Sequence, residues 1–123
     1  MSFKTDKKDN YTLIKFSTNK LDAIVAPDLK AELVLISKQG AKNILINLES
    51  VRYCDSSGLS ALLIGHRVCK DANGLFILST LQPAVQKLIT ISQLDTILTI
   101  KDTAEEAVNT VFVDDIERNL GAE

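Results

Sequence analysis

The sequence predicts an α/β domain in which a single mixed β-sheet of about five strands carries about four helices. Short apolar and β-branched runs alternate with longer segments whose apolar residues recur every three or four positions. Strands that alternate with helices typically form one sheet with helices packed on it. The 123 residues, 46% of them apolar, can bury one core, and no repeat or linker divides them. We therefore expect one domain over residues 1–123. Its short helices would cover one side of the sheet more naturally than two, and the sequence leaves that choice open.

The first strands are predicted near the N-terminus. Residues 3–8 can form a short edge strand, and residues 11–16 are aromatic and β-branched, which is typical of a strand. Asp and Asn at positions 9 and 10 favour a turn between these two runs. Residues 19–22 carry no strand or helix pattern, so we expect a loop there.

A helix and a central strand follow this loop. Pro27 suits the first turn of a helix, where its missing N–H has no cost, and Gly40 is a suitable stop. Residues 44–48 are a short apolar run typical of a strand that is buried on both faces. The apolar stripe of the predicted helix consists of Leu29, Leu33 and Ile36.

The middle of the chain repeats the pattern of helix and strand. Residues 59–70 have helical periodicity, and the Asn73-Gly74 pair ends this helix. Residues 75–78 form the next predicted strand, and Pro83 opens another helix. The inner side of the first of these helices is predicted to carry Leu59, Leu62, Leu63 and Val68. The inner side of the second is predicted to carry Val85, Leu88 and Ile89.

The last predicted strand is at residues 97–100, and a final helix follows it. Asp102 and Thr103 offer a cap, and the acidic residues after them suit the positive end of a helix dipole. The apolar stripe of this helix is predicted to consist of Ala107, Val108, Val111 and Phe112.

Composition and charge exclude several functional classes. No apolar run reaches the ~18 residues of a membrane span, and the N-terminus lacks the apolar stretch of a signal peptide. We therefore expect a cytoplasmic protein without a membrane partner. The net charge of −2 and the scattered lysines and arginines argue against direct binding of nucleic acid.

The sequence also lacks the patterns of an enzyme or a metal site. No Gly-rich phosphate loop or nucleophile elbow is present, so we expect neither catalysis nor a cofactor. Cys54, Cys69 and His66 cannot complete a zinc site by themselves. We expect both cysteines to be small buried apolar residues, although Cys54 lies close enough to the motif below for redox sensitivity to be considered.

The most informative segment is Asp55-Ser56-Ser57-Gly58-Leu59, which joins a predicted strand to a predicted helix. The start of a helix presents N–H groups without partners and a partial positive charge. A phosphate on a serine there would be stabilised locally. The structural alternative is that Ser56 caps the helix, a task that Asp55 could equally perform.

This segment and its surroundings resemble the STAS domain of the anti-sigma factor antagonist family. The similarity is strongest over residues 47–59 and extends over a core of residues 8–112, leaving 113–123 as a C-terminal extension. The family pattern Asp-Ser-Ser/Thr-Gly-Leu implies phosphorylation of the serine after the aspartate, which is Ser56 here, with Ser57 as the second candidate. A weaker match at Leu21-Asp22 implies that Asp22 lies in a loop beside the phosphorylation site.

The resemblance implies a partner-switching regulator. The unphosphorylated protein would bind an anti-sigma Ser/Thr kinase and so release a sigma factor. Phosphorylation of Ser56 by that kinase would end the complex, and a PP2C-type phosphatase would restore it. The alternative is a STAS domain that binds without switching, in a transport system or a sensory assembly. The implied partner-binding and switch loop comprises Asp22, Asp55, Ser56, Ser57, Gly58 and Leu59.

Overall fold

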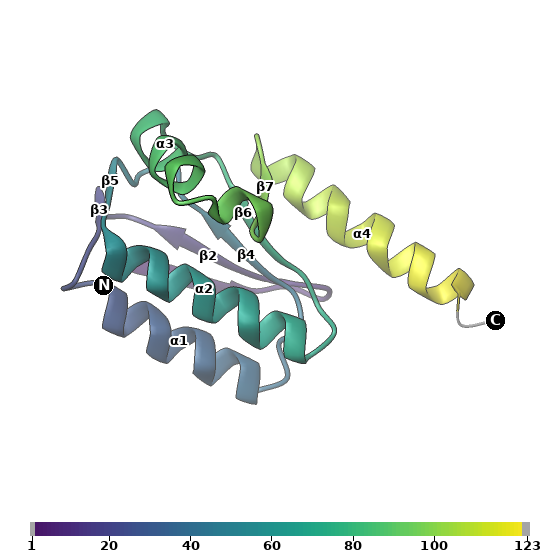
Figure 1. The fold of residues 1–123 in the computed structure, drawn as a ribbon. Helices are drawn as coiled ribbons and strands as arrows, with labels where there is room; N and C mark the ends of the chain where they lie inside the picture. Colours follow the sequence, from purple (N-terminus) through teal and green to yellow (C-terminus); the bar gives the residue numbers. More distant parts are fainter. Residues whose placement is uncertain (1, 122–123) are drawn as a thin grey trace.

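A five-stranded mixed sheet is the centre of the computed structural model, which describes residues 2–121 (Figure 1). The strand order is β1-β2-β4-β6-β7. Strand β1 pairs antiparallel with β2, and every other neighbouring pair is parallel. The sheet and the order of its elements confirm the predicted fold. The strand bounds are Phe3–Lys7 for β1, Thr12–Phe16 for β2, Ile44–Asn47 for β4, Phe76–Ser79 for β6 and Thr99–Lys101 for β7.

Two short strands form a separate parallel pair beside this sheet. They are β3 (Lys20–Leu21) and β5 (Tyr53–Cys54). The prediction of a loop over residues 19–22 was therefore wrong at its centre. Two residues are too few to show an alternating pattern, so sequence periodicity could not reveal either strand.

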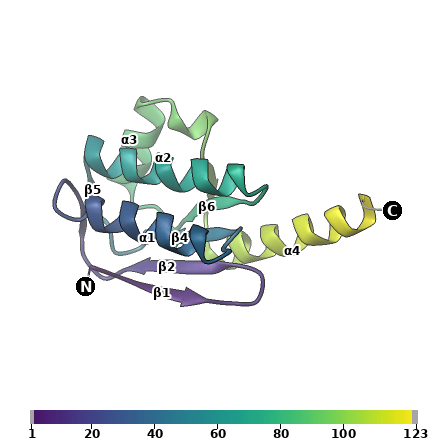
Figure 2. The same cartoon turned by 90° about the horizontal axis from the view of Figure 1, so that it is seen from below.

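Helices α1 (Ala26–Lys38), α2 (Ser56–Asp71) and α3 (Pro83–Ile91) pack on one face of the sheet, with α1 and α2 side by side (Figures 1 and 2). Helix α2 begins earlier than residue 59, because Asp55 serves as its cap. Leu63 and Val68 lie at the edge of the core and are only partly buried. The fully buried side chains between these helices and the sheet include Ile14, Phe16, Leu29, Leu33, Ile46, Leu62 and Leu78.

Helix α4 (Ala104–Gly121) lies on the opposite face, so the helices cover both faces and not the single face that the sequence favoured. The physical reason is that β4 and β6 are apolar on both sides, as central parallel strands usually are. Leu45 and Ile77 point away from the other helices, and they are covered by Ala107 and Val111 of α4.

The end of α4 differs from the sequence prediction in two ways. Phe112, expected in the buried stripe, is 45% exposed because the helix rotates it away from the sheet. Residues 113–121 of the expected extension continue the helix, whereas residues 122–123 lie outside the described part of the chain. The predicted cap is present, since Thr103 Oγ1 accepts a hydrogen bond of 3.1 Å from the N–H of Glu106.

The segment before the last strand is also different. A 3-10 turn at Leu94–Thr96 precedes the strand, and β7 begins at Thr99 rather than at residue 97. Ile97 is consequently half-exposed instead of paired in the sheet.

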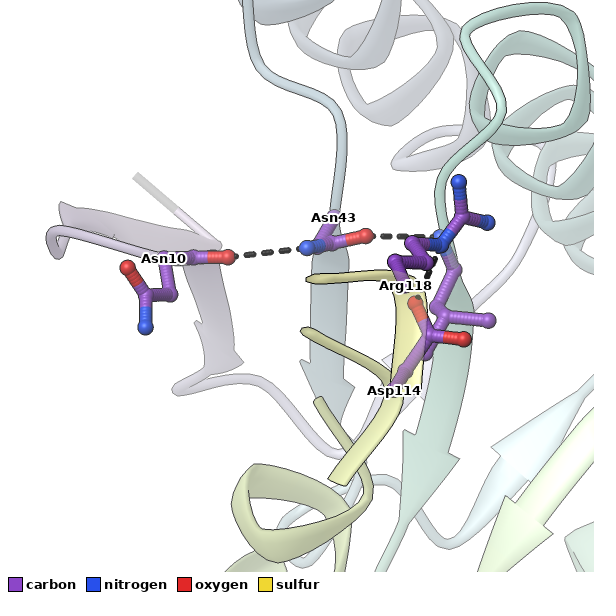
Figure 3. Close-up of polar contacts among 5 residues, drawn as sticks. Asn10, Asn43, Asp114 and Arg118 are labelled. Carbon is purple, nitrogen blue, oxygen red and sulfur yellow. Dashed lines mark hydrogen bonds and ion pairs between the residues drawn. The ribbon is translucent and has the colours of Figure 1, made fainter. Parts of the chain in front are cut away.

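One buried side chain fixes the amino ends of three strands. Asn43 Nδ2 donates to the carbonyl oxygen of Asn10 at 3.0 Å, and its Oδ1 accepts from the N–H of Leu75 at 2.8 Å (Figure 3). These bonds join the segments that enter β2, β4 and β6. Because Asn43 is almost fully buried, satisfying both ends of its amide stabilises this edge of the sheet.

Candidate partner-binding site

The β3–β5 pair brings two distant parts of the candidate loop together. Leu21 is the register partner of Cys54, and the N–H of Asp55 donates to the carbonyl oxygen of Leu21 at 3.4 Å. Parallel strands end at the same edge of their sheet, so the residues that follow them, Asp22 and Asp55, lie next to one another. The structure therefore places Asp22 beside the start of α2.

Asp55, not Ser56, is the N-cap of α2. Its Oδ1 accepts from the N–H of Gly58 at 3.0 Å, and its backbone carbonyl accepts from the N–H of Leu59 at 3.0 Å. An aspartate at this position satisfies a helix N–H and places a negative charge at the positive end of the dipole. Of the two capping residues that the sequence left open, the structure selects Asp55.

Ser56 is consequently free of a capping role and is exposed at the first position of α2. Ser57 follows in the same turn and is half-buried. A group added to the Ser56 hydroxyl would meet the N-terminus of α2, where the adjacent Asp55 already places a carboxylate in the cap. A phosphate there would create a concentrated negative charge rather than fill an empty cationic site.

Gly58 and Leu59 face inward, unlike the two serines. Leu59 belongs to the main core. A Cβ on Gly58 would lie 2.4 Å from the carbonyl oxygen of Leu21 and 2.7 Å from Cys54 Sγ. Only glycine allows α2 to approach the β3–β5 pair this closely, so Gly58 sets the position of the exposed serines.

Asp22 shapes the turn that leads into α1. Its Oδ1 accepts from the N–H of Ile24 at 3.0 Å and from the N–H of Val25 at 3.2 Å. This pattern of aspartate bonding to the backbone just ahead of it is a common way to stabilise a turn. Asp22 thus has a structural task in addition to its place beside Asp55.

The family model of the STAS domain matches residues 2–107 of the chain. This chain belongs to the STAS domain family. The resemblance inferred from residues 47–59 is thereby confirmed.

Within the STAS family, the chain is similar to proteins named as anti-sigma factor antagonists. An anti-sigma-B factor antagonist of Bacillus subtilis (strain 168) is 30% identical over 109 residues, which cover 88% of this chain and 99% of the relative. The Bacillus cell fate determinant SpoIIAA in its phosphorylated form is 26% identical, with a TM-score of 0.70 and coverage of 89% and 98%. A putative anti-sigma factor antagonist from Thermotoga maritima shares the fold, with a TM-score of 0.79, 24% identity and coverage of 89% and 93%.

Two exposed apolar side chains beside the loop were not predicted from the sequence. Ile24, in the turn between Asp22 and α1, is 83% exposed, and Tyr53, in β5 just before Cys54 and Asp55, is 53% exposed. Exposed apolar and aromatic residues of this kind are favoured at protein interfaces. No periodicity separates Ile24 from its buried neighbour Val25, so only the folded turn reveals it.

Cys54 lies behind the loop as a buried thiol. Desolvation by burial, with a further contribution from the charge of Asp55, raises the pKa of Cys54 to about 12. Burial likewise raises the pKa of Cys69 to about 12. The thiolate is the reactive form of cysteine, so these environments disfavour redox chemistry at either residue.

We expect the folded domain to resist alkylation. At pH 8, iodoacetamide should leave Cys54 and Cys69 unmodified, because a pKa near 12 keeps the thiolate fraction on the order of 10⁻⁴. The thiolate fraction, and with it the rate of labelling, should rise about tenfold for each pH unit below the pKa. Intact-mass spectrometry after timed labelling measures this, with the urea-unfolded chain as the control that reacts at both positions. Labelling of Cys54 at the rate of the unfolded chain would show that the loop opens readily.

Neither a metal centre nor a membrane span emerges from residues 2–121. Within this range no three His, Cys, Asp or Glu side chains gather in a way that could hold a metal ion. No helix in the same range is both long and apolar enough to cross a membrane.

Proposed function

We propose that this STAS domain is an anti-sigma factor antagonist that is switched off by phosphorylation of Ser56. The observation that carries the proposal is the exposed Ser56 at the first position of α2, where Asp55 and not Ser56 caps the helix. The names of the relatives support the same role. The partners in this proposal are an anti-sigma Ser/Thr kinase and a PP2C-type phosphatase.

The unphosphorylated surface fits a protein partner. Ile24 and Tyr53 offer exposed apolar contact area, and Asp22 and Asp55, which directly follow the paired strands β3 and β5, offer carboxylate acceptors for a partner's donors. Binding of the anti-sigma kinase to this surface would release its sigma factor. The domain itself performs no catalysis in this scheme and requires no cofactor.

The switching step adds charge where the two carboxylates already lie. Ser56 Oγ would attack the γ-phosphorus of ATP held by the kinase, the bond to the bridging β–γ oxygen would break, and ADP would leave. The hydroxyl proton would pass to a base of the kinase. The phosphate brings a charge of roughly −1.5 to −2. In an interface fitted to a neutral hydroxyl, this charge would have to lose its hydration and would repel neighbouring carboxylates, so binding would weaken. Hydrolysis by the phosphatase would return the hydroxyl and release inorganic phosphate.

Peptide mass spectrometry on protein isolated from its native host tests the modification. We expect phosphate on the peptide that spans Asp55 to Leu59, assigned to Ser56 rather than Ser57, and lost after treatment with a PP2C-type phosphatase. Persistent absence of phosphate across growth and stress conditions would instead favour a STAS domain that binds without switching.

A further inference from the structure

The last turns of α4 carry a second apolar stripe that stays exposed among residues 2–121. Phe112, Val113, Ile116 and Leu120 are 45%, 52%, 59% and 68% exposed. Positions 112, 116 and 120 share one side of the helix, whereas Ala107 and Val111 face the sheet from another. The end of α4 projects beyond the sheet in both views (Figures 1 and 2).

Acidic residues border this stripe. Asp114 is bound within the helix to Arg118, with Nε and Oδ2 2.8 Å apart (Figure 3). Asp115 and Glu117 have no ion-pair partner among residues 2–121 and flank the apolar positions. The projecting end is therefore both apolar and negatively charged, so it fits a surface that is apolar and positively charged.

A surface of this kind lies on the face of the sheet that α4 covers. A hollow of about 460 Å³ lies over β1 and β2, where the partly buried Leu13 contributes apolar surface and Lys4 and Lys15 contribute charge. Lys4 is the direct register partner of Lys15. Like charges opposite one another in a sheet are destabilising, so this pair is best accommodated when anions lie nearby. The one carboxylate that lines the hollow, Asp6, is paired with Lys8 at 3.8 Å.

The α4 end of one chain cannot fill the hollow of the same chain. Asp115 lies near Tyr11 and Asn43, at the amino ends of β2 and β4. The hollow is lined by Lys15, Phe16 and Ser17, at the carboxyl end of β2. Since α4 is one continuous helix, its last turns point away from the hollow and are available only to another molecule.

We propose that two copies of this chain associate by placing the α4 end of each in the lysine-lined hollow of the other. In such a two-fold symmetric dimer, the α4 end and the hollow of each copy are both occupied, so no surface remains free to bind a third copy. Direct pairing of two α4 ends would bring Asp115 and Glu117 of the two copies together, so charge favours the exchange. This inference is independent of the proposed phosphorylation.

Sedimentation of the full-length chain over a concentration series tests the exchange. We expect the apparent mass to approach twice 13.5 kDa. Ile116→Asp and Lys15→Glu should each weaken association at least tenfold, because they act on opposite sides of one contact. The double variant Lys15→Glu with Glu117→Lys should regain most of the lost affinity.

Matched controls come from α1, which lies on the other face. Leu35 is 49% exposed and Lys38 is exposed, so Leu35→Asp and Lys38→Glu make the same chemical changes away from both surfaces. These variants should associate like the unmodified chain, and circular dichroism should show every variant folded. A monomer at all concentrations would overturn the proposal. So would a dimer broken by Ile116→Asp but indifferent to Lys15→Glu, which would indicate pairing of α4 with α4.

Discussion

Ser56→Asp is expected to weaken binding of the anti-sigma kinase about a hundredfold, or about 3 kcal/mol, whereas Ser56→Ala should leave the affinity within a few-fold of the original. The added carboxylate would lie next to Asp55 at the start of α2, and binding of the kinase would have to desolvate this additional charge. Alanine only removes a hydroxyl that caps nothing. Titration calorimetry with the kinase measures the difference.

The unfolding temperature separates a lost interface from a lost fold. Both Ser56 variants should melt close to the original protein, because Asp55 provides the cap and an acidic first turn suits the helix dipole. Ser92→Asp, at the exposed end of α3, adds the same charge elsewhere and should bind normally. Equal affinities for Ser56→Asp and Ser56→Ala would rule out the charge-based switch.

Gly58→Ala should give the largest loss of stability near the site. Alanine improves helix propensity by roughly 1 kcal/mol, but its Cβ would lie 2.4 Å from a backbone oxygen, which cannot move aside as a flexible side chain could. Overpacking of this kind costs about 1–3 kcal/mol and sometimes more, so we expect a net loss of roughly 2 kcal/mol. Urea unfolding measures the free energy, and kinase affinity should fall as well because the start of α2 is displaced.

Gly121→Ala is the matched control for this substitution. Gly121 also lies in a helix, but a Cβ there would meet no heavy atom within 4 Å. The change should leave the free energy of unfolding within about 0.5 kcal/mol or raise it slightly. If the two alanine variants unfold at the same urea concentration, the close approach of α2 to β3 does not constrain the domain as we infer.

The sequence predicted the main sheet well because its strands and helices are long enough to show a period. Leu29, Leu33 and Ile36 all became buried at the predicted helical spacing. The errors arose where tertiary contacts decide the outcome. The two-residue strands β3 and β5 exist only as a pair, and the position of α4 depends on Leu45 and Ile77 needing cover on the second face.

The candidate site was only partly accessible to sequence reasoning. The local motif located the start of α2, but it could not choose between Ser56 and Asp55 as the cap, since both residue types are favoured there. The choice follows from the bond between Asp55 and Gly58. Ile24 and Tyr53 remained hidden because exposure of an isolated apolar residue is a property of the folded turn.

The close fit at Gly58 has a consequence for any enzyme that modifies Ser56. Buried neighbours on both sides, Cys54 and Gly58, hold the serine in a helical turn and keep it from being drawn out as an extended strand. Such an enzyme would have to recognise a shape assembled from the turn at Asp22 and the start of α2. A short peptide with the sequence of the motif lacks that conformation, so we expect it to be a poor substrate for the enzyme.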